Sequence, residues 1–153
     1  MSTNRIKSLR VMVIVILELL VFQFEFGMAV NLSPSLAPIP GFPFSVSGVV
    51  GALQPVGFPA LAHAALGIFL GIMSIANLIL SIASRVRSAW IFGLLGFLFI
   101  LLAVINGVLF TLSGFQFDGL SHGMANSFIL AFTFYFLELY GLKGVPRLSP
   151  DKK

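Results

Sequence analysis

The sequence predicts an all-α integral membrane protein, an up-down-up-down bundle of four transmembrane helices. Of its 153 residues, 58% are hydrophobic and 9% are charged, whereas soluble domains are roughly 45–50% apolar and about 25% charged. The apolar residues also gather into four long runs, and a run of about 20 residues is enough for a helix to cross a bilayer. This composition excludes a water-soluble enzyme and an intrinsically disordered chain.

The four apolar runs define the helices that we expect, at residues 11–30, 60–83, 89–112 and 120–142. Short connections join the last three, so neighbouring helices should be antiparallel. A longer outer loop, residues 31–59, separates the first two; it is uncharged and rich in Pro, Gly and Ser. The runs are continuously apolar rather than alternating, which excludes a transmembrane β-barrel. Residues 1–153 should therefore form a single membrane domain.

The first run has a second interpretation, as a secretory signal peptide. Basic residues precede it, and the small residues of segment 27–29 resemble a cleavage site. However, Glu18, Gln23 and Glu25 interrupt the apolar run. We therefore expect this segment to be retained as a transmembrane helix.

The basic residues predict the orientation of the bundle. All nine fall in the amino terminus, the connection between the second and third helices, or the carboxyl tail: Arg5, Lys7, Arg10, Arg85, Arg87, Lys143, Arg147, Lys152 and Lys153. Basic segments stay on the cytoplasmic side, so we expect a multi-pass protein of the cell membrane with both termini cytoplasmic. The net charge of +4 then indicates contact with anionic lipid of the bilayer rather than a nucleic-acid partner.

Ionisable groups within membrane spans default to a functional role, and the two histidines are the strongest candidates. His63 and His122 lie near the outer ends of the second and fourth helices, which should be diagonal to each other. Two imidazoles at the same depth are suited to axial ligation of a haem iron. Gly67 leaves space for a flat macrocycle beside His63, and Asn126 shares the side of His122. These four residues form the predicted cofactor site.

This arrangement resembles that of the membrane b-type cytochromes of the four-helix kind, whose second and fourth helices carry the haem-ligating histidines. That family has a further His pair deeper in the bundle. The matching positions here are Ala76 or Asn77 and Tyr135 or Phe136. The resemblance therefore implies one haem b, at the outer side, and electron transfer, with a membrane quinol as a potential partner. The predicted outer face departs from the pattern, because it has no Arg or Lys for the haem propionates.

Two carboxylates of the first helix, Glu18 and Glu25, are seven residues apart and share one face. They are candidates for a proton relay, and Glu25 for a hydrogen-bond partner of a ligating imidazole. With the two histidines, Glu25 would also complete a two-His-one-carboxylate iron site. The alternative is that each is a neutral acid, hydrogen-bonded to Asn77, Asn106 or a partner subunit.

The fourth helix carries another carboxylate, Glu138, near its inner end. We expect this side chain to snorkel to the interface or to pair with Lys143. The third helix carries a stripe of small residues that predicts close helix packing: Gly93, Gly96, Ala103, Gly107 and Gly114. The chain has no Cys, which excludes disulfides, thiolate metal sites and iron–sulfur clusters.

The leading functional prediction is a b-type cytochrome with one haem held by His63 and His122. The alternatives are a non-catalytic accessory subunit of a larger membrane complex or a His/Glu metal-binding membrane protein. The potential protein partners are a second copy, in a homo-oligomer, or the other subunits of such a complex. A small oligomeric transporter is less favoured, because no pair of broken helices is evident. The carboxylates distinguish these hypotheses, since Glu18 and Glu25 pointing away from the bundle would favour a partner.

Overall fold

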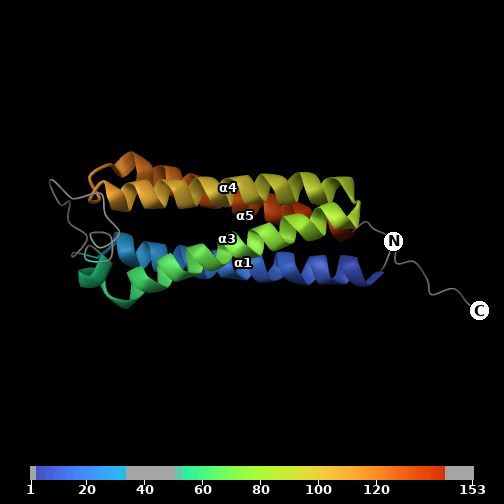
Figure 1. Cartoon of the computed structure of the whole chain (residues 1–153), viewed down its shortest axis with the longest axis horizontal. Coiled ribbons are helices and arrows are strands. Elements are labelled where there is room, and N and C mark those ends of the chain that lie inside the picture. The colour runs from blue at the N-terminus through green and yellow to red at the C-terminus, as the bar shows by residue number, and fades with distance from the viewer. Residues whose placement is uncertain (1–2, 34–50, 52, 144–153) are drawn as a thin grey trace, which may run out of the picture.

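The computed structural model describes residues 3–33, 51 and 53–143. It contains four long helices, α1 (Thr3–Asn31), α3 (Phe58–Ser84), α4 (Arg87–Leu112) and α5 (Asp118–Lys143), with a 3-10 turn, η1 (Gln54–Val56), before α3. All four are long and apolar enough to cross a membrane. They lie side by side and alternate in direction (Figure 1). The prediction of a four-helix, multi-pass protein is therefore confirmed, while most of the outer loop, residues 34–50, lies outside the described residues.

The four helices form a ring in which each packs against two others. α1 contacts α3 and α5, and α4 contacts the same two helices. The diagonal pairs are therefore α1 with α4 and α3 with α5, as the order of the helices predicts. The described turns use left-handed backbone conformations, at Arg85 between α3 and α4 and at Gly114 and Phe115 between α4 and α5.

α1 begins eight residues before the predicted apolar run. The reason is that buried residues continue along one side of the helix into its basic segment. Ile6 and Leu9 are buried, and they extend the inward row of Val13, Ile16 and Leu20 at alternating spacings of three and four. The amino-terminal segment is therefore an amphipathic continuation of the transmembrane helix.

α3 has a polar side toward the bundle and an apolar side away from it. Its inward row is Ala60, His63, Gly67, Leu70, Ser74, Asn77, Ser81 and Ser84. Its outward row consists of exposed aliphatic residues, Leu61, Ile68, Ile72, Ile75, Ile79 and Ile82. A water-soluble helix has the opposite pattern. This inversion indicates that the outer surface of α3 faces lipid.

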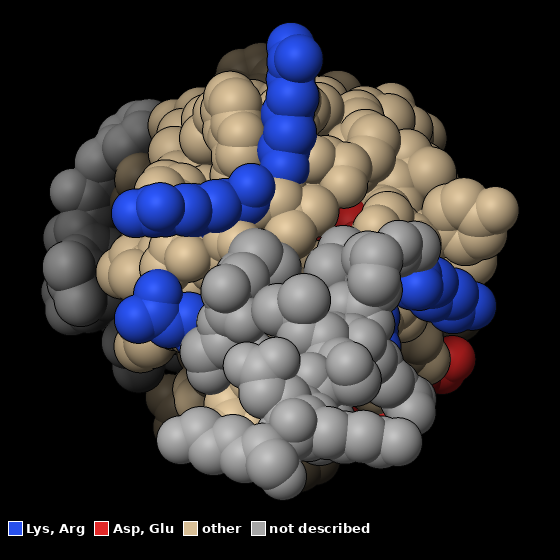
Figure 2. Space-filling view, turned by 90° about the vertical axis from the view of Figure 1, so that its right-hand side faces the viewer, with Lys and Arg blue, Asp and Glu red and all other residues tan. Residues whose placement is uncertain are grey.

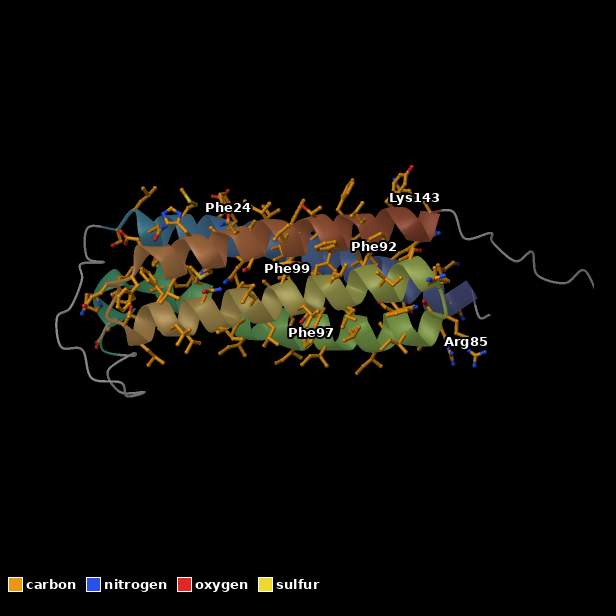
Figure 3. The ribbon with its side chains drawn as sticks, turned by 90° about the horizontal axis from the view of Figure 1, so that it is seen from above. Phe24, Arg85, Phe92, Phe97, Phe99 and Lys143 are labelled. Carbon is orange, nitrogen blue, oxygen red and sulfur yellow. The ribbon has the colours of Figure 1, made fainter. Side chains whose placement is uncertain are left out.

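Small residues of α4 let α5 approach closely. A Cβ at Gly96 would lie 2.8 Å from the ring of Tyr135, and one at Gly107 would lie 3.1 Å from the sulfur of Met124. Aromatic stacking fills the same interface, where Phe134 of α5 stacks on two rings of α4; Figure 3 shows these rings, Phe92 and Phe99. The predicted close packing is confirmed, although Gly114 lies in the turn after α4.

One end of the bundle, which we call the basic end, carries all the described Lys and Arg residues: Arg5, Lys7, Arg10, Arg85, Arg87 and Lys143. Figure 2 shows this end with its basic side chains spread around the rim, and Figure 3 shows Arg85 and Lys143 at the same end. Arg10 joins two helices there, because its guanidinium donates a hydrogen bond to the carbonyl oxygen of Leu142. The other three basic residues lie outside the described part of the chain.

Candidate functional site

His63 lies on α3 and faces α1. Its Nδ1 is 3.1 Å from the carbonyl oxygen of Gln23, and its Nε2 is 3.3 Å from the side-chain nitrogen of the same residue. A carbonyl oxygen only accepts, so Nδ1 carries the hydrogen and Nε2 accepts from the amide. Both ring nitrogens of His63 are therefore engaged by one residue of the neighbouring helix.

Two glycines make this contact possible, one on each helix. A Cβ at Gly27 would lie 3.0 Å from the His63 ring, and a Cβ at Gly67 would lie 3.4 Å from the side-chain nitrogen of Gln23. Each polar side chain therefore lies over a glycine of the other helix. The space at Gly67, which we expected to admit a macrocycle, is filled by Gln23.

His122 does not face His63. It is exposed on the outside of α5, as is Asn126, whereas His63 is half-buried against α1. The expected convergence of the two imidazoles across the core is therefore not seen. Both ring nitrogens of His63 are bonded to Gln23 in this arrangement.

Glu18 and Glu25 both lie on the exposed side of α1. Neither makes a hydrogen bond or an ion pair with another described residue, so Glu25 does not support an imidazole. Among all the residues that the structure describes, no cluster of three or more His, Cys, Asp or Glu side chains is close enough to hold a metal. The two-His-one-carboxylate arrangement is thus not assembled.

The prediction for Glu138 was wrong, because this carboxyl is fully buried between α3 and α5. Its Oε2 accepts a hydrogen bond of 2.9 Å from the Asn77 side chain, and its Oε1 lies 2.5 Å from the Ser81 hydroxyl. Lys143 instead lies over the ring of Tyr140, 6.0 Å from its centroid. The carboxyl turns inward because donors on the diagonal helix reach it.

Gly93 of α4 provides the space for this buried group. A Cβ there would lie 2.9 Å from the Ser81 oxygen and 3.2 Å from Oε1 of Glu138. We call Asn77, Ser81, Tyr135 and Glu138 the buried polar cluster; all four are fully buried. This cluster was not among the predicted sites, although the polar residues at helical spacing on α3 were a usable signal in the sequence.

The polar oxygen atoms of this cluster are not all satisfied. Among the described residues, Asn77 Oδ1 and the Tyr135 hydroxyl have no hydrogen-bond partner. Ser74 lies beside Tyr135, but its own hydroxyl donates to the carbonyl oxygen of Gly71 at 2.7 Å. Buried polar atoms are almost always paired, and the described residues include two more that are unpaired outside the cluster, Arg10 Nε and Gln23 Oε1.

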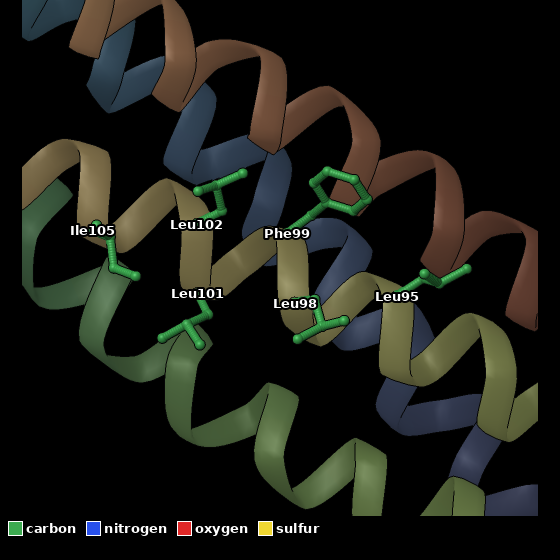
Figure 4. Close-up of a pocket in the computed structure, with 6 residues that line it drawn as sticks. All are labelled: Leu95, Leu98, Phe99, Leu101, Leu102 and Ile105. Atoms are coloured by element: carbon green, nitrogen blue, oxygen red, sulfur yellow. The ribbon is translucent and has the colours of Figure 1, made fainter.

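An apolar groove lies on the part of the surface formed by α4, shown in Figure 4. It is lined by Leu95, Leu98, Phe99, Leu101, Leu102 and Ile105, all on α4, and has a volume of about 340 Å³. A groove of this composition on a membrane helix is suited to acyl chains of the surrounding lipid.

The described residues thus present two features of interest, the exposed carboxylates of α1 and the buried polar cluster between α3 and α5. The fold positions both within membrane-spanning helices. No protein-family model, curated protein or solved structure matches this chain.

Proposed function

We propose that this protein is a non-catalytic subunit of a larger membrane assembly, with both termini on the cytoplasmic side of the cell membrane, and that α1 docks it to a second copy of the same chain. The observation that carries the proposal is the exposure of Glu18 and Glu25 on the outside of the bundle. The basic end supports the orientation, since basic segments remain cytoplasmic.

The depth of these carboxylates in the bilayer supports the presence of a partner. Glu18 is about 4 Å along the helix from the centre of the apolar run, and Glu25 is about 7 Å from it, at 1.5 Å per residue. Both distances are well within the half-thickness of the hydrocarbon core, about 15 Å. An acidic side chain facing lipid near the bilayer centre costs about 3 kcal/mol. Two such groups per chain favour a surface that is covered in the native assembly.

A complementary row of polar residues occurs on the exposed side of α5: His122, Asn126, Thr133 and Tyr140. Its depth relative to α1 follows from two contacts between the helices. Phe24 stacks on Phe128 with ring centroids 5.5 Å apart, and Arg10 binds the carbonyl oxygen of Leu142. These contacts are 14 residues apart on both helices, so the antiparallel register is constant along the pair.

This register places the donors at the depth of the carboxylates. Glu25 is one residue beyond Phe24, and Asn126 is two residues before Phe128, so they differ in depth by only about 1.5 Å. By the same register, Glu18 is within one residue of Thr133. The Asn126 amide has no partner among the described residues and is free to donate to a carboxylate. Thr133 donates to Ile129 at 2.9 Å and can still accept from a neutral carboxyl.

A second copy brings these groups together. A two-fold axis normal to the membrane keeps every residue of both copies at its own depth. Because α1 and α5 are neighbours, such an axis beside them sets α1 of each copy against α5 of the other, which is the closed arrangement that dimers favour. Hydrogen bonds between membrane helices contribute about 0.6 kcal/mol on average, so the main gain is removal of the carboxylates from lipid.

The absence of Cys from the chain allows a clean cross-linking test. Val21 and Ile129 are exposed apolar neighbours of the carboxylates and of their proposed partners. Val21→Cys and Ile129→Cys, carried on two differently tagged copies in one membrane, should form a disulfide between copies. The matched control pairs Val21→Cys with Ile75→Cys, which lies on the lipid-facing row of α3 and should not cross-link.

A second arm of the experiment measures mass in mild detergent. The native chain should be a dimer, and Glu18→Leu with Glu25→Leu should shift it to a monomer that remains helical. A monomeric native protein with no cross-link in membranes would contradict self-association. Co-purification at fixed stoichiometry with a different membrane protein would show that this protein, and not a second copy of the chain, is the partner of α1. A haem spectrum that depends on His63 and His122 would instead restore the cytochrome hypothesis.

A further inference from the structure

The buried polar cluster carries an inference that is independent of the docking surface. Glu138 is 0% exposed, and no described Lys, Arg or His forms an ion pair with it. α4 presents Gly93 to it, α3 presents neutral Asn77 and Ser81, and the half-buried Arg10 of α1 is bound to Leu142. The hydrogen-bond partners of the carboxyl are therefore neutral, and the Arg10 cation is bonded one helical turn away, at Leu142.

The hydrogens available in the cluster allow two arrangements of this carboxyl. The Ser81 hydroxyl has a single hydrogen, yet its oxygen lies 2.8 Å from the Asn77 carbonyl oxygen and 2.5 Å from Oε1 of Glu138. A carbonyl oxygen only accepts. If Glu138 is ionised, the Ser81 hydroxyl can donate to Oε1, and the Asn77 carbonyl oxygen still accepts the backbone N–H of Ser81 within α3. If Glu138 carries a proton, it donates to Ser81, and Ser81 donates to Asn77.

One unpartnered oxygen also favours the neutral state. Asn77 Oδ1 belongs to the amide that donates to Glu138, and it has no donor of its own among the described residues. An ionised carboxylate would add negative charge beside an acceptor that already lacks a donor. A neutral carboxylic acid removes that charge and supplies one more hydrogen to the cluster.

The depth of Glu138 makes this difference energetically large. It lies about 11 Å along the helix from the centre of α5, still inside the hydrocarbon core, whose half-thickness is about 15 Å. An unpaired ionised group in such a place costs several kcal/mol, more than any single hydrogen bond in the cluster returns.

From these contacts, we propose that the buried polar cluster is a proton-binding site. One proton resides on Glu138 at neutral pH and is donated to Ser81, which donates in turn to the Asn77 carbonyl oxygen. The ligand class is a proton rather than a metal cation, because the carboxyl and the hydroxyl are within hydrogen-bonding distance of each other. Loss of the proton leaves an uncompensated carboxylate inside the bundle.

Infrared spectroscopy tests the proton directly. The background is Glu18→Gln with Glu25→Gln, which leaves Glu138 and the exposed Asp118, the first residue of α5, as the carboxyl side chains of the described spans. At about pH 7, this protein should show the carbonyl stretch of a protonated carboxyl group, and adding Glu138→Gln should remove it. Ser81→Ala should shift the same band, because the acceptor of the proton is lost. A spectrum without a protonated carboxyl band overturns the proposal, even if the Glu138→Gln variant does not fold.

Thermal unfolding in detergent separates a proton from a metal cation. The neutral acid is the form that the folded bundle favours, so the melting temperature of the native chain should fall as the pH rises from about 6 to about 9. The Glu138→Gln variant should lack this dependence, and replacing sodium by choline should change neither protein. A melting temperature that sodium raises in the native chain alone would assign the cluster to a metal cation and overturn the proposal.

Discussion

The imidazole ring of His63 on α3 lies directly over Gly27 of α1, so closely that a Cβ at position 27 would be 3.0 Å from ring carbon Cε1. Gln23 lies in the same way over Gly67 and holds both nitrogens of the ring. Two polar residues and two glycines therefore join α1 to α3 at the end of the bundle opposite the basic end. Two of the four residues of the predicted cofactor site, His63 and Gly67, take part in this helix contact.

This contact predicts that Gly27→Ala destabilises the protein. The added methyl group must displace the His63 ring, and overpacking of this kind costs about 1–3 kcal/mol. Thermal unfolding in detergent should show a lower melting temperature. Gly71→Ala is the control, since no atom lies within 4 Å of a Cβ there. The double variant Gly27→Ala with His63→Ala should lose less stability than the sum of the losses in the two single variants. Strictly additive losses would contradict the contact between the two residues.

Gly96→Ala should destabilise the bundle more than Gly27→Ala. A Cβ at Gly96 would lie 2.8 Å from the ring of Tyr135, and that ring is fully buried, so it has less room to move than the half-buried His63. We expect the free energy of unfolding to fall by about 3 kcal/mol, the upper end of the range for overpacked cores. Chemical denaturation under the same conditions compares the free energies of unfolding of the two variants. An equal decrease in both would show that the Tyr135 ring can move away from the added methyl group.

Tyr135→Phe should leave the stability unchanged or raise it by up to about 1 kcal/mol. The hydroxyl is buried without a hydrogen-bond partner among the described residues, so removing it eliminates an unsatisfied polar group. Asn77→Ala should behave differently, because it removes the donor to Glu138 and should cost about 1–3 kcal/mol. Thermal unfolding compares the two variants. A markedly lower melting temperature for Tyr135→Phe would show that the hydroxyl has a hydrogen-bond partner.

Haemin added to the purified protein should give no six-coordinate spectrum that requires both histidines. His63 is bonded through both ring nitrogens to Gln23, and His122 is exposed on another side of the bundle. Visible spectra with and without dithionite, on the native chain and on the His63→Ala and His122→Ala variants, make the comparison. His63→Ala should lower the melting temperature, whereas His122→Ala should not.

Arg10→Ala should destabilise the basic end by about 1–2 kcal/mol. Arg10 is half-buried and donates to the carbonyl oxygen of Leu142 in the last turn of α5, where helix carbonyls have no partner within the helix. Arg5→Ala removes the same charge from an exposed position and is the matched control. Equal melting temperatures for the two variants would mean that only charge, not the bond to α5, is important.

Much of the fold was predictable from the sequence, because the length of an apolar run and the distribution of basic residues are properties of the chain itself. The four runs became four helices, and the predicted order made α3 and α5 diagonal. The end of α1 was less predictable, since its extension to Thr3 depends on the burial of Ile6 and Leu9 against the other helices.

The candidate site was less predictable, because the side that a residue presents depends on how each helix is rotated. A periodicity of 3.6 residues showed that Glu18 and Glu25 share a face, but not that this face is exposed. Similarly, Glu138 lies near a helix end, where a snorkelling side chain would be ordinary. Its burial depends on Asn77 and Ser81, 61 and 57 residues away in the sequence.

The sequence by itself determined that this is a four-helix membrane protein whose described basic residues gather at one end, because hydrophobic transfer and charge placement act on each segment separately. Only the tertiary structure decided which polar residues meet. Helix rotation and close approach at Gly27, Gly67 and Gly93 joined His63 to Gln23 and enclosed Glu138 between α3 and α5. Those contacts depend on packing between helices, which no single segment contains.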